Sequence, residues 1–546
     1  MSLTRNVLLM SAGTMTSRIL GLVRGIMLAQ VIGVFGLTAD VFQVANTLPN
    51  QFYALVGGGV LNGILVPQIV KARTQADQGE AFTNRIITLA VTFLLVSTLI
   101  LTLLAPWLVS LFSDDFPPDA QRLATIFAAI CLPQVFFYGL YTLLGQILNA
   151  HGRFLPYLWA PVLANLVAIA GLVWFKVAGY PLQAPVSQWS TPMILTLAGS
   201  ATLSILVQAV CLVIPLRRIG FRFRPVWGIR GVGLATTSRI ALWTMAGVAV
   251  SQAGFAVTST ALTRAANFGT ETGAAVPSRG TFDYAFLLFM LPHSLITVSL
   301  VTALFTRMAG SVSDGDAEGV RRDYRSAILT VAPLLIPASA LIATLAPVVT
   351  GTLYVGNTLA ETRVIAVMVT WMVLGVLPYG WLYLNDRTFF VHDDGKTPFL
   401  IQCLVTGTAV SFAVAALLGP PERIGVLVAI GQTTAYVIGA LAGMALLRHR
   451  LGRLGIAHLL STCARIAVPA GVYAVLLAWV VGRLLPGLGE TRGMAAMLSG
   501  GLVLTLAGGA QLALTWFSAH LLGVREIGDA AASIAARVRR RGATGA

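Results

Sequence analysis

The sequence has few charged residues for its length. Only 10% of the 546 residues are Asp, Glu, Lys or Arg, whereas a soluble globular protein has about 25%. A deficit of this size excludes an ordinary soluble domain, and it is typical of a chain that places most of its residues in lipid.

Cysteine is also scarce and shows no regular spacing. The four cysteines all lie in apolar stretches and form no C-x-x-C pair: Cys131, Cys211, Cys403 and Cys463. Zinc sites and the disulfide frameworks of small secreted proteins show characteristic spacings. The sequence therefore predicts neither a structural metal nor a disulfide framework.

The sequence also lacks the motifs of nucleotide hydrolysis and of hydrolase catalysis. The nearest approach to a Walker A loop is FFVHDDGKTP, but Phe390 stands where the leading glycine is required. Pro398 follows where the helix of that loop should begin. H-E-x-x-H and G-x-S-x-G are absent, and the six histidines are scattered. We therefore predict no enzyme activity, no catalytic residue, no bound metal and no cofactor.

Long apolar runs, by contrast, recur from one end of the chain to the other. Hydrophobic residues make up 57% of the sequence, and a run of 18 or more can cross a hydrocarbon core of about 30 Å. We predict an all-α polytopic membrane protein with about fourteen transmembrane helices. The approximate spans are 7–33, 38–70, 83–113, 120–150, 154–178, 192–216, 235–267, 281–309, 324–353, 361–385, 397–418, 423–447, 458–483 and 494–523.

Basic residues concentrate in alternate connections between these spans. They include LRRIGFRFRPVWGIRG (216–231), RHRLGR (448–453) and RVRRR (537–541), whereas the other connections contain few bases. Cytoplasmic loops of membrane proteins contain an excess of Lys and Arg, which predicts that both termini are cytoplasmic. The same rule explains the formal net charge of +16 without nucleic acid as a partner. The tail (524–541) is predicted to be a basic amphipathic helix on anionic lipid.

Two pairs of short segments indicate an internal repeat. QILNAHGRFLPYLWAP and LYLNDRTFFVHDDGKTP both contain Leu-Asn and then Arg with Phe at a cytoplasmic turn, with Asn149 matching Asn385. A Leu-Pro pair recurs in spans 2 and 8 at a similar offset. Parallel repeats about an axis along the membrane normal occur in transporters. We predict two six-helix lobes related by a pseudo-two-fold axis, divided as N-terminal lobe 1–218, basic cytoplasmic linker 219–234, C-terminal lobe 235–450, two further helices 451–523 and basic cytoplasmic tail 524–546.

The first predicted span contains Arg18 and Arg24, with no acid nearby in sequence. An arginine at the centre of a membrane helix costs about 2.5–3.5 kcal/mol on insertion scales. Two guanidinium groups in a water-filled cavity would bind phosphate or pyrophosphate in a bidentate manner. The alternatives are structural pairing with Asp40, or snorkelling of the side chains to the cytoplasmic interface. Other polar residues of the first two spans include Ser17 and Asn50.

Several segments together resemble one family of membrane proteins. SRILGLVRGIMLAQVIG, TADVFQVANTLPN and LVPQIVKA are similar to the opening of the MurJ (MviN) family of lipid II flippases, in the multidrug/oligosaccharidyl-lipid/polysaccharide exporter superfamily. LNAHGRFLPYLWAPVLANL and DRTFFVHDDGKTP resemble two further family signatures, and the resemblance covers nearly the whole chain. The residues of these cytoplasmic-turn signatures are Asn149, Arg153, Asn385 and Arg387.

The resemblance implies a protein of the bacterial cytoplasmic membrane that moves a lipid-linked peptidoglycan precursor to the outer leaflet by alternating access. Its implied partners are the undecaprenyl-pyrophosphate-linked substrate, anionic lipids and proteins of cell-wall synthesis. Ser17, Arg18, Arg24 and Asp40 fall on positions that the family uses in a central cationic cavity, so that the arginines would hold pyrophosphate while Asp40 orients or releases them. Because no nucleotide site is present, transport would be coupled to the membrane potential, to a monovalent ion, or to consumption of the cargo.

The sequence departs from the family pattern at several cavity positions. Gly25 stands where many relatives have an acid, Gly58 replaces a glutamate, and Leu287 lies near the position of an arginine. Tyr53 and Ala54 occupy the positions of an arginine pair. The cavity is therefore expected to contain less charge than the family pattern implies.

Two arginines in the second half of the chain could supply part of the missing charge. Arg264 and Arg279 flank the external turn before span 8, and Asp283 lies at the outer mouth of that span. Their positions favour an interface role for each of them. Arg264 and Arg279 are nevertheless candidates for an auxiliary positive charge in the cavity.

Two other functions fit parts of the same pattern. A related exporter of another lipid-linked oligosaccharide would need the same pyrophosphate site, whereas a drug exporter for cationic cargo would need unpaired acids in its cavity. A membrane scaffold for cell-wall enzymes would have no use for arginines inside a span, since their insertion is unfavourable. Lipid II translocation is therefore the prediction that accounts for most of the sequence.

Overall fold

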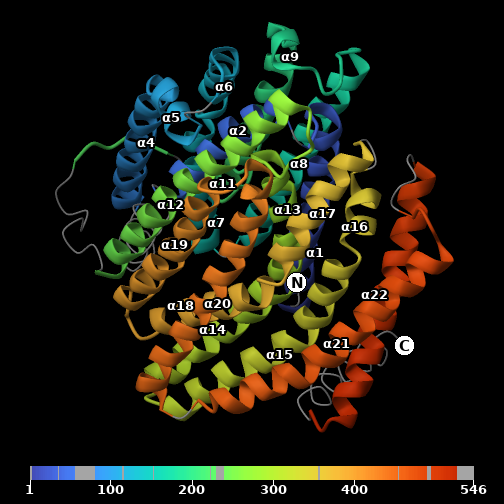
Figure 1. Ribbon diagram of the computed structural model, residues 1–546. Helices are drawn as coiled ribbons and strands as arrows, with labels where there is room; N and C mark the ends of the chain where they lie inside the picture. The colour runs from blue at the N-terminus through green and yellow to red at the C-terminus, as the bar shows by residue number, and fades with distance from the viewer. Residues whose placement is uncertain are drawn as a thin grey trace, which may run out of the picture. The chain divides into compact units, whose positions relative to one another are not determined.

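The computed structural model describes residues 3–34, 36–55, 80–113, 116–151, 153–221, 223–228, 239–354, 357–452, 454–488 and 494–524. Regular structure within these ranges is entirely helical (Figure 1), which confirms the predicted all-α class. Most of the predicted basic tail, much of the linker and the segment 56–79 lie outside the described residues.

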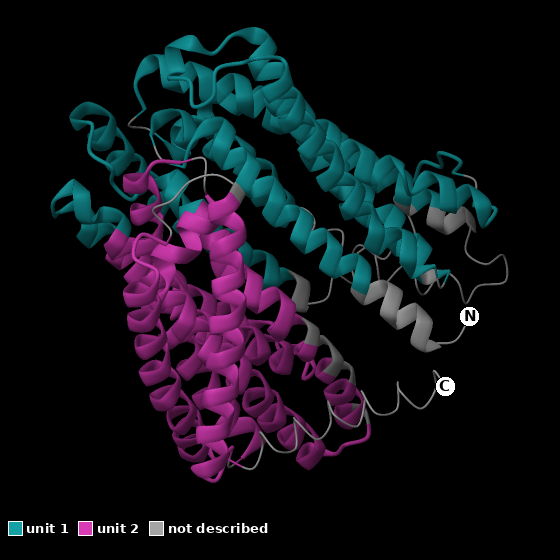
Figure 2. Ribbon diagram, turned by 90° about the vertical axis from the view of Figure 1, so that its right-hand side faces the viewer, with its two compact units in different colours: residues 1–283, 413–425 teal, residues 284–412, 426–546 magenta. Residues whose placement is uncertain are grey.

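Contacts between residues divide the chain into two compact units (Figure 2). Unit 1 comprises residues 1–283 and 413–425, and unit 2 comprises residues 284–412 and 426–546. This division follows contacts, whereas the predicted lobes follow an internal repeat. The lobe boundaries therefore stay a prediction.

Unit 1 is built from the helices of the first half of the chain. Among these helices, α1, α8 and α12 each contain an apolar segment long enough to cross a membrane. The described helices are α1 (Leu3–Ile32), α2 (Leu37–Leu55), α4 (Glu80–Leu103), α5 (Ala105–Phe112), α6 (Pro118–Cys131), α7 (Gln134–Ala150), α8 (Phe154–Val177), η2 (Val186–Gln188), α9 (Thr191–Ile194), η3 (Leu195–Gly199), α10 (Ser200–Val210), α11 (Val213–Arg218), α12 (Arg239–Thr272) and η6 (Pro421–Arg423).

Unit 2 contains most of the remaining helices. Helix α13 begins in unit 1 and continues into unit 2, and α19 and α20 also cross the division. These helices are α13 (Arg279–Pro292), η5 (His293–Thr297), α14 (Val298–Ser313), α15 (Ala317–Thr344), α16 (Ala346–Leu353), α17 (Leu359–Val373), α18 (Val376–Phe390), α19 (Lys396–Leu417), α20 (Ile424–Leu451), α21 (Ile456–Leu484) and α22 (Met494–Leu521).

Ten helical segments of the described chain are long and apolar enough to cross a membrane, and two bent pairs bring the number to twelve. Helices α4 and α5 bend by 69°, and α17 and α18 bend by 45°. A proline in the first turn of α5 has no backbone N–H to continue the ladder of α4. The chain is therefore a multi-pass membrane protein. Two predicted spans are not among the twelve: 38–70, which extends beyond the described residues, and 281–309.

Aromatic side chains form the centre of the unit 1 core. Phe42 of α2 packs edge-on against Phe127 of α6 at 5.3 Å between ring centroids, and Trp189 lies 5.3 Å from Phe127. Phe175 of α8 lies 5.9 Å from Trp189. The Trp189 contacts hold the segment between α8 and α9 against α6 and α8, and Phe42 joins α2 to the same aromatic group.

Hydrogen bonds between helices hold α21 and α22 in unit 2. The indole nitrogen of Trp516 donates to the Pro333 carbonyl of α15 at 3.1 Å, and the Gln511 amide donates to the Ala470 carbonyl at 2.7 Å. Pro337 is a second proline in α15, so that helix offers carbonyls without intrahelical donors. Interhelical hydrogen bonds of this kind stabilise helix association in lipid.

Candidate functional site

Helix α1 places the two predicted arginines in different surroundings within unit 1. Arg18 is exposed, whereas Arg24 is partly buried and lines a pocket. Six residues of helix separate them by about 9 Å along the axis and turn them to different sides of the helix. The pocket therefore contains one of the two predicted cations.

The pocket lies inside unit 1 between α1, α2, α7, α8 and α10. It has about 540 Å³ of empty space, part of which is open solvent. Half of its lining residues are polar, and none of these described lining residues is acidic. The polar lining residues are Arg24, Asn46, Asn50, Gln134, Tyr138, Ser200 and Ser204.

This lining suits an anionic group that also has hydroxyl or amide functions. The guanidinium of Arg24 offers a fork of N–H donors that matches phosphate oxygens. The Ser200 and Ser204 hydroxyls donate to the Leu197 and Ala201 carbonyls at 3.1 and 2.7 Å, and the Gln134 amide donates to the Thr202 hydroxyl at 3.1 Å. Their oxygen atoms can still accept hydrogen bonds from hydroxyl or amide groups of a ligand. A carboxylate would repel an anion, so its absence from the described lining favours anion binding over cation binding.

Aromatic residues form the wall beside this pocket. The Tyr53 ring lies 5.4 Å from the Tyr138 ring, and the Tyr53 hydroxyl hydrogen-bonds to the Thr142 hydroxyl. Asn50 makes a side-chain hydrogen bond to Tyr138. Tyr53, which stands where the family pattern has an arginine, thus packs on the pocket wall and adds aromatic surface instead of charge.

Ser17 has a structural contact in this arrangement. Its carbonyl oxygen accepts a hydrogen bond from Asn165 Nδ2 at 3.0 Å, and its hydroxyl oxygen lies 3.3 Å from the same nitrogen. Asn165 belongs to α8, so these bonds join α1 to α8 about two helical turns before Arg24. Ser17 therefore fixes the position of the helix that presents Arg24.

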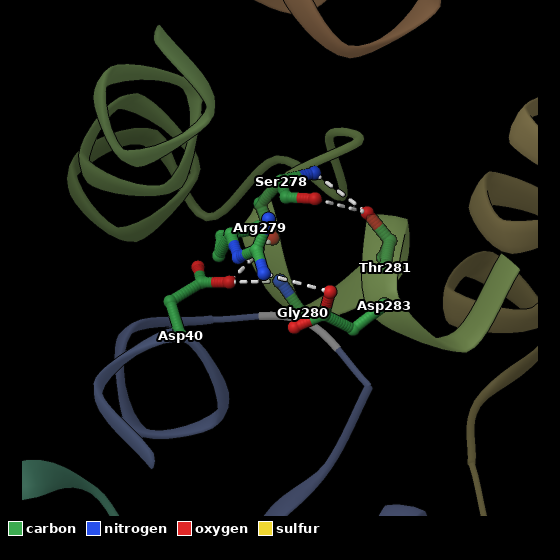
Figure 3. Close-up of polar contacts among 6 residues, drawn as sticks. All are labelled: Asp40, Ser278, Arg279, Gly280, Thr281 and Asp283. Atoms are coloured by element: carbon green, nitrogen blue, oxygen red, sulfur yellow. Dashed lines mark hydrogen bonds and ion pairs between the residues drawn. The ribbon is translucent and has the colours of Figure 1, made fainter. Parts of the chain in front are cut away.

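Asp40 lies at the centre of a second polar group, which we call the Asp40 cluster. The carboxylate is fully buried, and its Oδ1 accepts a hydrogen bond from the Ser278 hydroxyl at 3.1 Å and another from the Gly280 backbone N–H. Gly280 is in the first turn of α13, whose free N–H groups favour an anion. Figure 3 shows the cluster, which consists of Asp40, Ser278, Arg279, Gly280, Thr281 and Asp283.

Ser278 and Thr281 complete this helix start. The Ser278 N–H donates to the Thr281 hydroxyl at 2.6 Å, and that hydroxyl donates to the Ser278 carbonyl at 2.9 Å. The Ser278 side chain is thereby free to reach Asp40 on α2. In the described chain Asp40 thus bonds to the start of α13, and neither Arg18 nor Arg24 is among its hydrogen-bond partners.

Arg279 is enclosed within the same cluster. Its side chain is 1% exposed, and its Nη2 lies 2.8 Å from Asp283 Oδ1. The guanidinium carbon also lies 4.4 Å from the centre of the Phe255 ring and 5.5 Å from that of Phe282. Arg279 is therefore paired and covered, whereas Arg264 of α12 is exposed and stays a candidate for an auxiliary positive charge.

The turn residue Asn385 has a structural role in unit 2. Its Oδ1 accepts a hydrogen bond from the Tyr324 hydroxyl at 2.6 Å, and its Nδ2 donates to the Ala440 carbonyl at 3.0 Å. Arg387 donates to the Tyr383 hydroxyl at 3.1 Å. Asn385 thereby joins α15, α18 and α20.

The matching turn in unit 1 ends its helix in the same way as the turn in unit 2. His151 Nδ1 lies 2.8 Å from the Ile147 carbonyl, and His392 Nδ1 lies 2.8 Å from the Thr388 carbonyl. Asn149 is partly buried just before the first turn, and Arg153 is exposed just after it. These four-residue bonds satisfy carbonyls that a helix end leaves free.

An ion pair lies at the unit 2 turn, outside the spans. Arg450 at the end of α20 pairs with Asp394, which also accepts hydrogen bonds from the Thr397 backbone at 3.0 Å and the Thr397 hydroxyl at 2.6 Å. Burial raises the pKa of Asp394, but the Thr397 bonds and the Arg450 charge outweigh it and hold the pKa below its ordinary value. Asp394 is therefore ionised at neutral pH and stabilises the first turn of α19.

Sequence analysis did not identify the pocket residues of α7 and α10. Ser200 and Ser204 are one helical turn apart in an apolar segment, and Gln134 follows a proline at the start of α7. The i, i+4 spacing of Ser200 and Ser204 is a signal that two hydroxyls share one face. Sequence alone could not show that this face meets Arg24.

The chain has several apolar helices long enough to cross a membrane. Unit 1 contains a polar pocket lined by the guanidinium of Arg24. These two features define a polytopic membrane transporter. The family model described as lipid II flippase MurJ matches residues 28–489. The chain therefore belongs to the MurJ family.

Relatives from distant bacteria match along the whole chain. A probable lipid II flippase MurJ of Rhizobium meliloti (strain 1021) is 26% identical, with 100% of this chain and 97% of that protein covered. The Vibrio cholerae protein of the same description is 26% identical, with 96% and 97% covered.

Solved structures support the same fold. A lipid II flippase MurJ in an inward closed conformation matches with a TM-score of 0.68 and 17% identity, over 92% of this chain and 98% of that one. An inward-facing multidrug resistance MATE family transporter matches with a TM-score of 0.62 and 17% identity, over 80% and 95%. Likeness at this identity concerns the fold alone.

Proposed function

We propose that this chain is a flippase that translocates lipid II from the cytoplasmic to the outer leaflet of the bacterial cytoplasmic membrane for cell-wall synthesis. It acts by alternating access, as a transporter and not as an enzyme. The family membership supports the cargo. The observation in the chain itself that supports it is Arg24, a partly buried guanidinium in a polar pocket without acidic lining among the described residues.

The pocket chemistry matches the head of such a cargo. Arg24 binds the pyrophosphate, because a guanidinium pairs with phosphate oxygens through two parallel hydrogen bonds. The hydroxyl and amide groups of α7 and α10 face the same space and bind sugar hydroxyls or amides of the head group. Arg18 remains exposed on α1 and attracts the anion before it reaches the pocket.

The location, the energy source and the further partners belong to the same proposal. Both termini are cytoplasmic, because the basic connections alternate along the chain. The basic loops bind anionic lipids, and proteins of cell-wall synthesis receive the product. Translocation is driven by the membrane potential or by a monovalent ion.

The experiment is rescue of a bacterium depleted of its own lipid II flippase. The full chain is compared with Arg24→Ala, Arg18→Ala and the matched control Arg423→Ala, which removes an exposed arginine of η6. We expect growth with the wild type and the control, weak growth with Arg18→Ala, and none with Arg24→Ala at equal membrane expression. Removal of a hydrogen bond to a charged group costs about 1.5–3 kcal/mol.

The other outcomes separate the cargo from the site. Rescue by all variants would retain the cargo and refute the role of Arg24. Failure of the well-expressed wild type, together with no flipping of purified lipid II in vesicles, would refute lipid II as the cargo and favour another lipid-linked oligosaccharide.

A further inference from the structure

The pocket of unit 1 has two sets of polar groups that differ in hydrogen-bonding capacity. The first set includes Arg24, whose guanidinium only donates hydrogen bonds. Asn46 and Asn50 of α2 belong to the same set, and Tyr138 is hydrogen-bonded to Asn50. The second set comes from α7 and α10, and we call it the acceptor wall. It consists of Gln134, Ser200 and Ser204.

The two serines of the acceptor wall use their protons within their own helical segment. Ser200 donates to the Leu197 carbonyl in the π turn η3, and Ser204 donates to the Ala201 carbonyl. Such bonds to a carbonyl three residues back are a common local alternative for serine. A hydroxyl has one proton and two lone pairs, so each serine oxygen offers the pocket its lone pairs.

Helix α8 packs directly against Ser200. Gly171 lies so close to it that an added Cβ would overlap the Ser200 Cβ and Oγ atoms. The π turn ends at Gly199, the residue before Ser200, and π turns inside helices are frequent at functional sites. Packing of this kind fixes a side chain in one position, which a selective binding site requires.

Thr202 of α10 sets the orientation of the Gln134 amide. The Thr202 hydroxyl donates to the Ile130 carbonyl at 2.8 Å, and Gln134 Nε2 donates to the Thr202 oxygen at 3.1 Å. Because a carbonyl only accepts, the Thr202 proton is used there, and its oxygen must accept from Gln134. The Cys131 thiol, which also hydrogen-bonds to Thr202, is a weak donor. The amide therefore turns its nitrogen toward Thr202, and Oε1 is the acceptor that Gln134 offers to the pocket.

A proline within a membrane span accounts for this use of Thr202. Pro133 lies between α6 and α7 in the apolar segment Pro118–Asn149. A proline in a membrane helix leaves backbone carbonyls that neighbouring Ser or Thr side chains satisfy, and Thr202 does so for Ile130 in the last turn of α6. Thr202 is not among the described residues that line the pocket, so its effect on a ligand is exerted through Gln134.

A ligand that satisfies both sets of groups combines an anion with hydrogen-bond donors. Phosphate oxygens accept hydrogen bonds, so they bind beside the N–H groups of Arg24. The lone pairs of the acceptor wall repel such oxygens and attract hydroxyl or amide N–H groups. A sugar attached to a phosphate contains both kinds of group. An analogue that lacks the donor leaves the buried acceptor unpaired and therefore loses affinity.

We propose that Gln134 determines specificity in this pocket, because its Oε1 accepts a hydrogen bond from a hydroxyl or amide N–H of a sugar whose phosphate is bound by Arg24. Thr202 is the positioning residue that presents this oxygen. The inference rests on the proposed flippase function and specifies the chemistry that the pocket selects: a phosphate attached to a sugar with hydrogen-bond donors, and not a phosphate alone.

The test is calorimetric titration of the purified full chain with two probes, N-acetylglucosamine 1-phosphate and methyl phosphate, which lacks the sugar donors. We expect the wild type to bind the sugar phosphate about tenfold more tightly than methyl phosphate. Gln134→Met keeps the length of the side chain but removes the acceptor, and it should lower this ratio about fivefold. Thr202→Val frees the amide to turn and should lower the ratio about threefold.

Two further variants distinguish positioning from a general loss of structure. Thr202→Ser keeps the hydroxyl and should restore the wild-type ratio. The matched control Thr125→Val removes a hydroxyl that donates to the Gln121 carbonyl within α6 at 2.8 Å, and it should leave the ratio unchanged. If Gln134→Met is not inserted in the membrane, Thr202→Val compared with Thr202→Ser decides.

The outcomes separate this inference from the proposed function. Equal wild-type affinities for the two probes would refute the inference and leave the anion site of Arg24 intact. A wild-type preference that persists in Gln134→Met and Thr202→Val would refute the roles of these two residues. Absence of binding of both probes to folded wild type would refute the anion site, on which the inference and the proposed binding of pyrophosphate both rest.

Discussion

Two arginines of unit 1, Arg24 and Arg279, are both inside helices of the membrane protein but have opposite surroundings. Arg24 is partly buried on a pocket whose described lining contains no acid. Arg279 is 1% exposed, pairs with Asp283 at 2.8 Å and is covered by Phe255. A guanidinium whose charge is satisfied within the fold stabilises structure, and one whose charge is directed into a pocket can bind a ligand.

The difference shows why intramembrane charge alone does not identify a binding residue. Both arginines are equally conspicuous in the sequence, and only their partners distinguish them. Burial of a paired charge is tolerated because the partner offsets the lost hydration, whereas removal of one member leaves the other uncompensated. Substitution should therefore affect stability at Arg279 and ligand binding at Arg24.

The largest effect is expected at the enclosed arginine. Arg279→Ala leaves the Asp283 carboxylate without its partner, and we expect a loss of about 3–5 kcal/mol in the free energy of unfolding. Thermal unfolding in detergent measures it. The double variant Arg279→Ala/Asp283→Ala should recover part of the loss, and equal unfolding temperatures for wild type and Arg279→Ala would refute the structural role.

The next effect concerns the pocket arginine. Arg24→Lys keeps the charge but loses the two-pronged donor geometry, so we expect the affinity for a soluble pyrophosphate-linked head-group analogue to fall about tenfold. Arg24→Ala should lower it further, to about a hundredth, as for a lost charge-assisted hydrogen bond. Calorimetric titration of purified protein gives both values. If the Arg24 variants lost thermal stability together with affinity, the result would show that Arg24 stabilises the fold, as Arg279 does, and would refute its role in binding.

A smaller effect is expected where α13 approaches α2. A Cβ added at Gly280 would lie 3.1 Å from Asp40 Oδ1 and 3.1 Å from the Val34 carbonyl, so Gly280→Ala must displace backbone. We expect a loss of about 1–3 kcal/mol, as for other overpacked sites. Unfolding in detergent would show it, with Gly310→Ala as the control, because an added Cβ there meets nothing within 4 Å.

The smallest effect is expected at the Asp394–Arg450 pair of unit 2, in which the arginine side chain is 44% exposed and the aspartate side chain 10% exposed. The pKa of Asp394 is held below its ordinary value, so its contribution is present above about pH 4 and is lost as the pH falls through the lowered value. The wild type should therefore lose thermal stability on acidification, and Asp394→Asn should remove part of that dependence. Because water reaches the Arg450 side chain and screens the charges, we expect a contribution of about 1 kcal/mol. Identical acid profiles for both proteins would refute this contribution.

The fold class and the candidate arginine Arg24 were predictable from the sequence for physical reasons. The length of an apolar run predicts whether a helix can cross a membrane. An arginine within such a run is unfavourable unless another group or water solvates its charge. The pocket partners of Arg24 were not predictable, because Gln134, Ser200 and Ser204 come from helices far along the chain. Isolated polar residues of this kind are common in helices, and only the packing of α7 and α10 against α1 brings these three to the pocket of Arg24.

The Asp40 cluster illustrates the same limit. Sequence analysis linked Asp40 with the arginines of α1, whereas the carboxylate bonds to Ser278 and Gly280, more than two hundred residues away. A helix N-terminus offers unpaired N–H groups wherever it is placed, but its position depends on the packing of intervening helices. The sequence around Asp40 and the sequence around Ser278 therefore contain no local pattern that predicts this contact.

The sequence by itself determined that the chain is an all-α membrane protein with basic residues in alternate loops and arginines inside its first span, because these properties depend on composition and order alone. Tertiary structure decided which charges are neutralised and which are available. Arg279 is enclosed by Asp283 and Phe255, and Arg24 faces a polar pocket. The physical reason is that the energy of a charge depends on the groups within a few ångströms of it, and in a helical membrane protein those groups come from distant parts of the chain.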